Sequence, residues 1–181
     1  MALPASSSEG FRGVTTSTPE LITHGVTLRP GSLTIICGPP ASGKTTLARA
    51  IEHDARSAGH ASAVSTVAGV IDWPKTEPGQ LAVAIVDPET WSTFNGSVEI
   101  AAEGLKHHAM DEGFAAVLTV QTNPHIGRVG SWTADWARIA DAVFWVESVD
   151  GLALATVTRD RRGTPSTQPT LVRRVLAEVT Q

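Results

Sequence analysis

The residues best suited to chemistry form one short stretch, Gly38-Pro39-Pro40-Ala41-Ser42-Gly43-Lys44-Thr45, which fits the pattern G-x-x-x-x-G-K-[ST]. The glycines allow a turn tight enough to direct backbone N–H groups at phosphate oxygens, and the positive end of the following helix adds to that field. Lys44 supplies a cation for the β- and γ-phosphates, while the Thr45 hydroxyl completes the coordination of Mg²⁺. The stretch therefore predicts binding of ATP and Mg²⁺ by residues 38–46, the last of which is Thr46.

A second candidate is Asp87, the carboxylate that ends the apolar run 81–86. A buried strand ending in an aspartate downstream of such a loop is where a Mg²⁺-holding aspartate belongs, although Asp-Pro also starts many turns. Hydrolysis further needs a carboxylate that orients or deprotonates water. Glu89 is the nearest acid, with Asp72 and Glu77 as alternatives, and each of the three is equally well an exposed loop acid.

Gln121 stands at the end of the next apolar strand, 115–120. An amide in this position can sense the γ-phosphate and pass its presence to the following loop. The alternative is a polar residue that only ends a strand. Gln121 is therefore a candidate catalytic residue, together with Lys44 and Glu89.

Hydrophobic periodicity predicts the elements that must position these residues. Mainly apolar runs typical of buried strands fall at 32–37, 81–87, 115–120 and 142–146, and small and β-branched residues predict a further strand at 61–67. Helical spacing runs from the glycine-rich stretch to a stop at Gly59 and recurs over 98–109, with a shorter helix at 134–140. Two final strands, 151–158 and 170–179, are joined by a hairpin-like loop. This order predicts an α/β fold with a mostly parallel central sheet flanked by helices, closed by a C-terminal antiparallel β-hairpin.

Length and composition set outer bounds. The 181 residues suit one domain, assigned to 21–181, behind a flexible arm at 1–20. The net charge of −4 gives no overall sign of nucleic-acid binding, so any such binding must be local. The single cysteine, Cys37, excludes a disulfide framework and is expected to be a small buried residue. No apolar run is long enough to span a bilayer and no signal peptide is evident, which favours a cytoplasmic protein without membrane contact.

Four segments together resemble RecA-type ATPases. They are the lead-in 30–36 with the glycine-rich stretch, the strand that ends in Gln121, the Ala-Asp strand 139–146, and the basic turn Thr158-Arg159-Asp160-Arg161-Arg162-Gly163-Thr164-Pro165. Within that superfamily the chain is most similar to DnaB-type replicative helicases and to the RadA and KaiC branch. The resemblance covers about residues 20–175 and implies a RecA-like P-loop NTPase fold with ATP hydrolase activity.

In that family, two basic residues of the turn reach the γ-phosphate bound by the neighbouring subunit, and by position these are Arg159 and Arg161. A guanidinium aimed at the transferring phosphate stabilises charge in the transition state, whereas the plainer interpretation is a solvated basic turn. The resemblance thus implies a homo-oligomer, either a ring, expected to be a hexamer, or a filament. The chain departs from the family after the second strand, where a catalytic Glu is replaced by residues 67–70 without an acid. Hydrolysis is then slow, or Glu89 acts as the catalytic carboxylate instead.

The resemblance also implies single-stranded DNA as a partner, held by the loops after Asp87 and Gln121. The basic and aromatic candidates there are His125, Arg128 and Trp132. The leading hypothesis is an oligomeric, helicase- or recombinase-like ATPase that couples hydrolysis to translocation on single-stranded DNA or to its remodelling. The alternatives are a small-molecule P-loop kinase and an ATP-gated assembly module with little hydrolysis.

Overall fold

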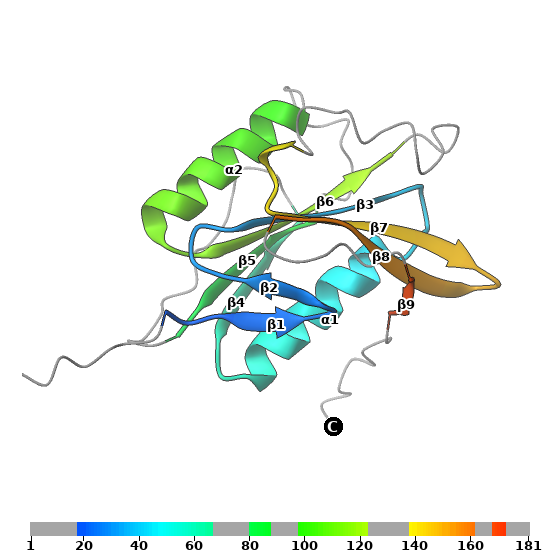
Figure 1. The fold of residues 1–181 in the computed structure, drawn as a ribbon, viewed down its shortest axis with the longest axis horizontal. Coiled ribbons are helices and arrows are strands. Elements are labelled where there is room, and N and C mark those ends of the chain that lie inside the picture. The colour runs from blue at the N-terminus through cyan, green and yellow to red at the C-terminus, as the bar shows by residue number, and fades with distance from the viewer. Residues whose placement is uncertain (1–17, 67–79, 88–97, 123–137, 162–167, 173–181) are drawn as a thin grey trace, which may run out of the picture.

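The computed structural model describes residues 18–66, 80–87, 98–122, 138–161 and 168–172, and these residues build one twisted sheet with a helix on each face (Figure 1). The strands of the sheet follow the order β4-β5-β6-β3-β7-β8-β9. In chain order they are β3 (Leu33–Gly38), β4 (Ala61–Ser65), β5 (Ala82–Val86), β6 (Ala115–Gln121), β7 (Ala142–Val149), β8 (Leu152–Asp160) and β9 (Thr170–Leu171). The helices are α1 (Lys44–Ser57) and α2 (Val98–Glu112), and a separate hairpin of β1 (Leu21–Thr23) and β2 (Val26–Leu28) precedes them.

The centre of the sheet is parallel. Strand β3 lies between β6 and β7, with Ile35 level with Leu118 on one side and with Val143 on the other. Every residue of β3 and of β5 is buried, including Thr34, because helices cover both faces of these strands. The continuous apolar runs in the sequence are the direct expression of that double burial.

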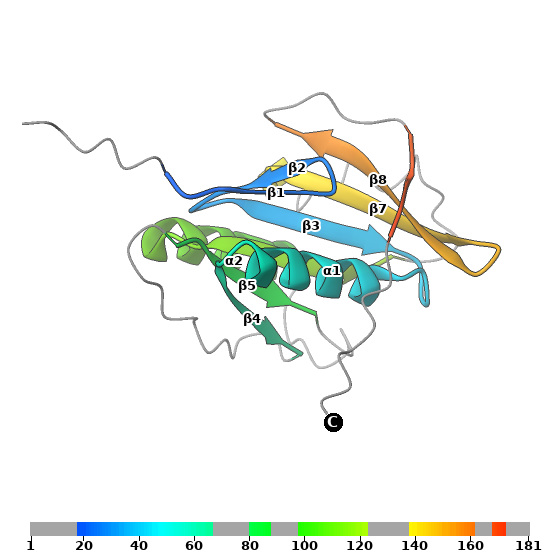
Figure 2. The same cartoon turned by 90° about the horizontal axis from the view of Figure 1, so that it is seen from below.

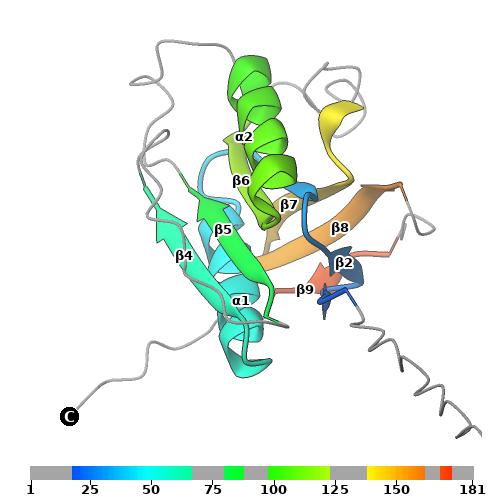
Figure 3. The same ribbon diagram turned by 90° about the vertical axis from the view of Figure 1, so that its left-hand side faces the viewer.

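The two faces of the sheet form two separate cores. The core on one face joins α1 and the β1–β2 hairpin to the sheet through side chains such as Leu47, Ile51 and Phe144. The core on the other face packs α2 on the sheet through Ala102, Ala109 and their neighbours. Figure 3, viewed from the β4 side, shows α2 above the strands and α1 below them.

The predicted fold class is confirmed, since β4, β5, β6, β3 and β7 run parallel and β7, β8 and β9 pair antiparallel with one another. The predicted pairing of the last two strands is present between β8 and β9, of which the structure describes Thr170–Leu171 and none of 173–179. The sequence prediction missed a second hairpin, in which β7 continues past residue 146 to Val149 and turns directly into β8. Its turn, Asp150-Gly151, has positive φ angles of 51° and 78°, as a two-residue hairpin turn with Asp-Gly requires.

Two other predictions fall largely on residues outside the described part of the chain. The arm at 1–20 lies almost entirely outside the described residues, as does most of the short helix at 134–140, whose described positions 138–139 are helical. Leu21 and Ile22 belong to the β1–β2 hairpin, which the sequence analysis did not predict. Neither α1 nor α2 is long and apolar enough to cross a membrane.

Candidate nucleotide site

The loop between β3 and α1 has the backbone shape that the glycine pattern predicts. Gly43 adopts φ 98° and Ala41 adopts φ 56°, and both values lie in the left-handed region. Alternation of left- and right-handed residues turns successive backbone N–H groups toward one concave side, which suits an anion. Ala41 carries a conformational cost in this geometry, because a side chain disfavours positive φ. Strain of this kind is typical of loops shaped for a ligand.

Both glycines are required by contacts with the β7–β8 hairpin. A Cβ on Gly38 would overlap the carbonyl oxygen of Val146, and it would lie 2.8 Å from Ser42 Oγ. A Cβ on Gly43 would lie 2.5 Å from the Cβ of Ala153. The hairpin therefore supports the phosphate-loop candidate from behind, and only glycine fits at either end of it.

Lys44 and the first turn of α1 give this loop positive character. The helix begins at Gly43 without a side-chain cap, and its first turn contains no acidic residue. Its N-terminal dipole charge is therefore left for another negative group. The Lys44 ammonium donates a 2.7 Å hydrogen bond to the Pro39 carbonyl and so lies against the loop itself. Burial lowers the pKa of Lys44, and the nearby Asp87 carboxylate opposes that change.

Asp87 is held at the end of β5 by two hydrogen bonds. Its backbone N–H donates to the Ser65 carbonyl at 2.9 Å, and its Oδ1 accepts a 2.5 Å hydrogen bond from Thr119 Oγ1. Thr119 is buried on the adjacent strand β6, so it fixes the carboxylate while leaving Oδ2 for another partner. Sequence reasoning missed Thr119. Its signal is a hydroxyl in an otherwise apolar strand, two residues before Gln121.

Gln121 lies beside the start of the loop. It is level with Gly38 across the β3–β6 pair, and it is exposed where the rest of β6 is buried. The next residue, Thr122, donates its N–H to the Gly38 carbonyl at 2.9 Å, which ties the end of β6 to the loop. The structure thus gathers Lys44, Asp87 and Gln121 at the ends of three neighbouring strands.

Arg159 and Arg161 lie at the opposite end of the strands from the loop, where β3 and β7 begin. Arg159 is level with Val143 on β7. The Arg161 backbone N–H donates to the Asp141 carbonyl, and the Asp141 backbone N–H donates to the Leu33 carbonyl. Leu33 begins β3 and Gly38 ends it, a separation of about 16 Å at a rise of about 3.3 Å per residue. Figure 2 shows the same division, with the β7–β8 turn at the end of the sheet where β3 leads into α1. These arginines therefore cannot serve the loop of their own copy.

The remaining candidates lie outside the described residues. They are Glu89, Asp72 and Glu77 among the acids, and His125, Arg128 and Trp132 among the DNA candidates. The structure adds no geometry for any of them.

Comparison with solved structures identifies the fold. The chain is similar to an ATPase domain at a TM-score of 0.57 and 10% identity, covering 76% of this chain and 80% of that one. It is similar to a DnaB-like replicative helicase, whose structure was described together with its interactions with primase, at a TM-score of 0.57 and 9% identity. That match covers 77% of this chain and 54% of the helicase chain. It is also similar to a KaiC-like protein from Pyrococcus horikoshii OT3, at 0.55 and 13% identity, with 81% and 86% covered.

These neighbours define the fold as that of the RecA-like ATPases, as the sequence resemblance predicted. At identities near 10% the likeness concerns the fold alone. No protein-family model and no curated protein sequence matches the chain.

Proposed function

We propose that this chain is an oligomeric RecA-like ATPase in which each copy binds ATP and Mg²⁺ at residues 38–46 and Asp87, and Arg159 and Arg161 complete the site of the next copy. One observation carries the proposal: the phosphate-loop candidate and the arginine pair lie at opposite ends of the strands of one sheet. This separation of loop and arginines serves a chemical purpose only when the loop of one copy faces the arginines of the next, as in a ring or a filament.

Each residue has a role that its position supports. The loop N–H groups and Lys44 hold the phosphates, while Thr45 and Asp87 coordinate Mg²⁺, an ion that normally takes one or two protein oxygens beside substrate phosphates. Gln121 senses the γ-phosphate from the end of β6. The bound metal neutralises charge on the phosphates, and the arginines of the adjoining copy stabilise the charge that develops during transfer.

Mixing two inactive variants tests the division of labour. Lys44→Ala destroys the loop of a copy and leaves its arginines, whereas Arg161→Ala does the reverse. Each variant alone should lose about 10³-fold or more in kcat, the usual contribution of an arginine finger. Mixed in equal amounts, they should regain turnover, because some interfaces combine an intact loop with an intact arginine. Arg56→Ala is the matched control, since Arg56 is exposed on α1 and pairs with Glu52 of its own helix.

Two results would contradict the proposal: full activity of Arg161→Ala, or mixtures that stay as inactive as their components. A chain that remains monomeric with saturating ATP, measured by light scattering, would contradict it as well.

We further propose that hydrolysis is coupled to movement on single-stranded DNA or to its remodelling, through the loop that contains His125, Arg128 and Trp132. The support is the residue content of that loop, which offers cations for phosphates and an indole for base stacking. ATP turnover with and without an oligonucleotide tests this step. Stimulation that falls in Arg128→Ala supports it, and unchanged turnover with DNA contradicts it.

A specific observation favours an ATP-gated assembly module as the second candidate. Strand β4 ends at Ser65, and the sequence after it contains no acid before Asp72. ATP-dependent assembly without turnover would select this candidate. The kinase alternative is less favoured, because Arg159 belongs to strand β8 of the sheet and a kinase lid would place it between helices.

A further inference from the structure

The end of the β7–β8 hairpin beside the phosphate-loop candidate carries a group of exposed aliphatic side chains. Val149 is level with Leu152 across the hairpin, and Leu154 is level with Leu171 on β9. Directly paired residues, and residues two apart along a strand, point to the same face of a sheet. Val149, Leu152 and Leu171 are 44%, 54% and 54% exposed, and Leu154 is partly exposed. We call these four side chains the hairpin patch.

The hairpin patch faces away from the loop of its own copy. Ala153, between Leu152 and Leu154, points to the other face, where it packs against the core that contains α1 and approaches Gly43. Figure 2 shows that the β7–β8 turn projects past the end of β3. Exposed aliphatic side chains that share one face of a projecting element are typical of a protein-binding surface.

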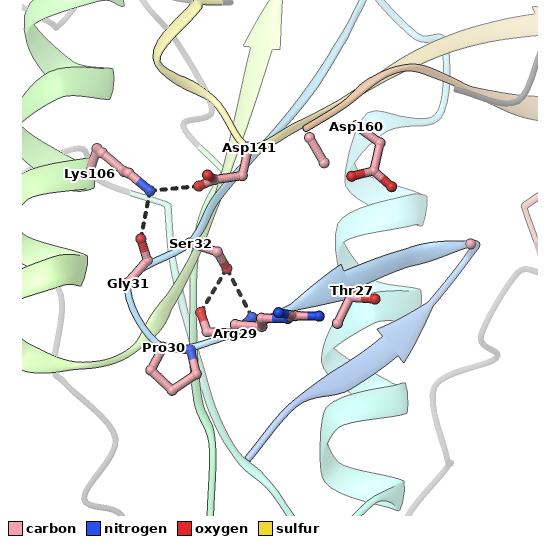
Figure 4. Close-up of a pocket in the computed structure, with 10 residues that line it drawn as sticks. Thr27, Arg29, Pro30, Gly31, Ser32, Lys106, Asp141 and Asp160 are labelled. Carbon is pink, nitrogen blue, oxygen red and sulfur yellow. Dashed lines mark hydrogen bonds and ion pairs between the residues drawn. The ribbon is translucent and has the colours of Figure 1, made fainter. Parts of the chain in front are cut away.

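The two ends of this hairpin differ in charge. Between residues 142 and 157 its only charged side chains are Glu147 and Asp150, both in the half that contains the turn. Around the start of β7 and the end of β8, three arginines outnumber two aspartates: Arg138, Arg159, Arg161, Asp141 and Asp160. One of these carboxylates, that of Asp141, is already paired with the Lys106 ammonium at 2.6 Å (Figure 4). The turn is therefore acidic, and the other end of the hairpin has a surplus of positive charge.

The arginine end also offers an exposed apolar side chain. The β1–β2 hairpin lies beside it, because Thr27 of β2 and Asp160 of β8 line the same cavity of about 260 Å³ (Figure 4). Ile22 of β1 is level with Thr27 and shares its face. The Ile22 side chain is 71% exposed, the largest exposed fraction among the large hydrophobic residues that the structure describes. An apolar contact point thus lies near the arginines, at the opposite end of the strands from the hairpin patch.

We propose that the hairpin patch of one copy docks on the β1–β2 hairpin of the next copy, at Ile22, beside the arginine end of the β7–β8 hairpin. The inference rests on the assembly part of the proposed function, because it names the surfaces through which neighbouring copies bind each other. A second copy is the occupant that the charges favour, since the acidic turn then meets the arginine end while aliphatic side chains meet Ile22. The two surfaces differ, so the contact is heterologous and repeats from copy to copy in a ring or a filament.

A carboxylate placed on either surface tests the contact. Leu152→Asp and Leu171→Asp alter the hairpin patch, and Ile22→Asp alters the receiving surface. Each should raise the protein concentration for half-assembly with ATP and Mg²⁺ about 30-fold, the effect of losing one central interface side chain. Sedimentation velocity measures this concentration. Ile100→Asp is the matched control for Ile22→Asp, because Ile100 is 65% exposed in the first turn of α2, and it should assemble as wild type does.

A mixture shows whether the two surfaces meet each other. Leu152→Asp keeps an intact receiving surface and Ile22→Asp keeps an intact patch, so one junction forms between them and no further copy can add to it. Each variant alone should stay monomeric at a concentration at which the wild type assembles, and their equal mixture should give dimers. A mixture that stays monomeric would overturn the inference.

The charge contribution has a variant of its own. Asp150→Asn removes the carboxylate at the turn, and asparagine tolerates the φ of 51° at this position. At low salt the concentration for half-assembly should rise about two- to fivefold, as for other exposed ion pairs. The difference should disappear at about 1 M salt, where charges are screened within about 3 Å. An unchanged concentration at low salt would overturn the pairing of the acidic turn with the arginine end.

The outcomes keep this inference apart from the proposed function. A wild-type chain that stays monomeric with saturating ATP defeats both. If the wild type assembles, and Leu152→Asp and Leu171→Asp assemble equally well, only this inference fails; a lower urea midpoint in these variants would then show that the chain's own residues 173–181 cover the patch. If Arg161→Ala keeps full activity while the patch variants fail to assemble, the proposed function fails and this inference stands.

Discussion

The methyl group of Ala153 lies 2.5 Å from the point where a side chain on Gly43 would begin. Strand β8 thus limits the shape of the loop between β3 and α1. Because Gly43 also has a φ of 98°, two independent constraints exclude any larger residue there.

Gly43→Ala should therefore abolish nucleotide binding and destabilise the chain by about 1–3 kcal/mol, the usual cost of overpacking. Gly104→Ala is the matched control, since a Cβ at this exposed position in α2 would meet nothing within 4 Å. It should stabilise the helix by about 0.5–1 kcal/mol. Urea denaturation and titration with a fluorescent ATP analogue measure both effects, and wild-type affinity in Gly43→Ala would contradict this account of the loop.

The stability of the nucleotide-free chain should carry a pH signature of Lys44. Burial lowers its pKa in the folded protein, so the folded chain holds this proton less tightly than the unfolded chain, whose lysines titrate near about 10.4. Stability from this group is gained as pH rises through the interval between the two values. Wild type should therefore gain stability relative to Lys44→Met as the pH is raised toward the ordinary lysine pKa of about 10.4. Denaturation of both proteins at several pH values checks the sign, and a relative loss would contradict it.

Removal of the Thr119 hydroxyl should weaken the magnesium response. Thr119→Val keeps the shape of the side chain but frees Asp87 Oδ1, so Mg²⁺-dependent ATP affinity should fall about 10- to 100-fold, as for other groups that orient a metal ligand. Thr156→Val is the control. The Thr156 hydroxyl is also buried, and within the described part of the chain it has no hydrogen-bond partner. Equal Mg²⁺ responses of the two variants would show that Asp87 needs no support.

Cys37 should report on unfolding. It is fully buried in β3, its Sγ lies 3.1 Å from the Phe144 carbonyl, and burial raises its pKa far above the ordinary thiol range. Since the thiolate is the reactive form, the native chain should resist alkylation. Labelling under native conditions should therefore proceed at the rate at which the sheet opens, and ATP should slow it. Rapid labelling of the folded chain would contradict the burial of β3.

The sequence predicted the parallel core because its strands are buried on both faces, so that the apolar run 82–86 and the run 33–37, broken only by Thr34, carry a direct signal. It also predicted the loop, Asp87 and Gln121, whose positions follow from strand ends. The first helix, expected to run to a stop at Gly59, ends at Ser57, with Ala58 as an exposed C-cap.

The misses share a physical cause, which is that they depend on partners far along the chain. Thr119 matters only because β6 lies beside β5. Ala153 is an ordinary small residue until the β7–β8 turn brings it to Gly43. That turn has a local signal, the Asp150-Gly151 pair, in which both residues adopt positive φ.

The β7–β8 hairpin has a mechanical consequence. Near its tip, Val146 and Ala153 touch the loop that we assign to ATP, and at its root it carries Arg159, which we assign to the adjoining copy. The two strands pair along the hairpin with one register shift, between Val143 and Phe144 beside Arg159, so the two ends of the hairpin are coupled through a β-bulge. A change in how tightly one copy binds its nucleotide would then move Arg159 toward or away from the site of the next copy. Successive sites would hydrolyse ATP in sequence without sharing a ligand.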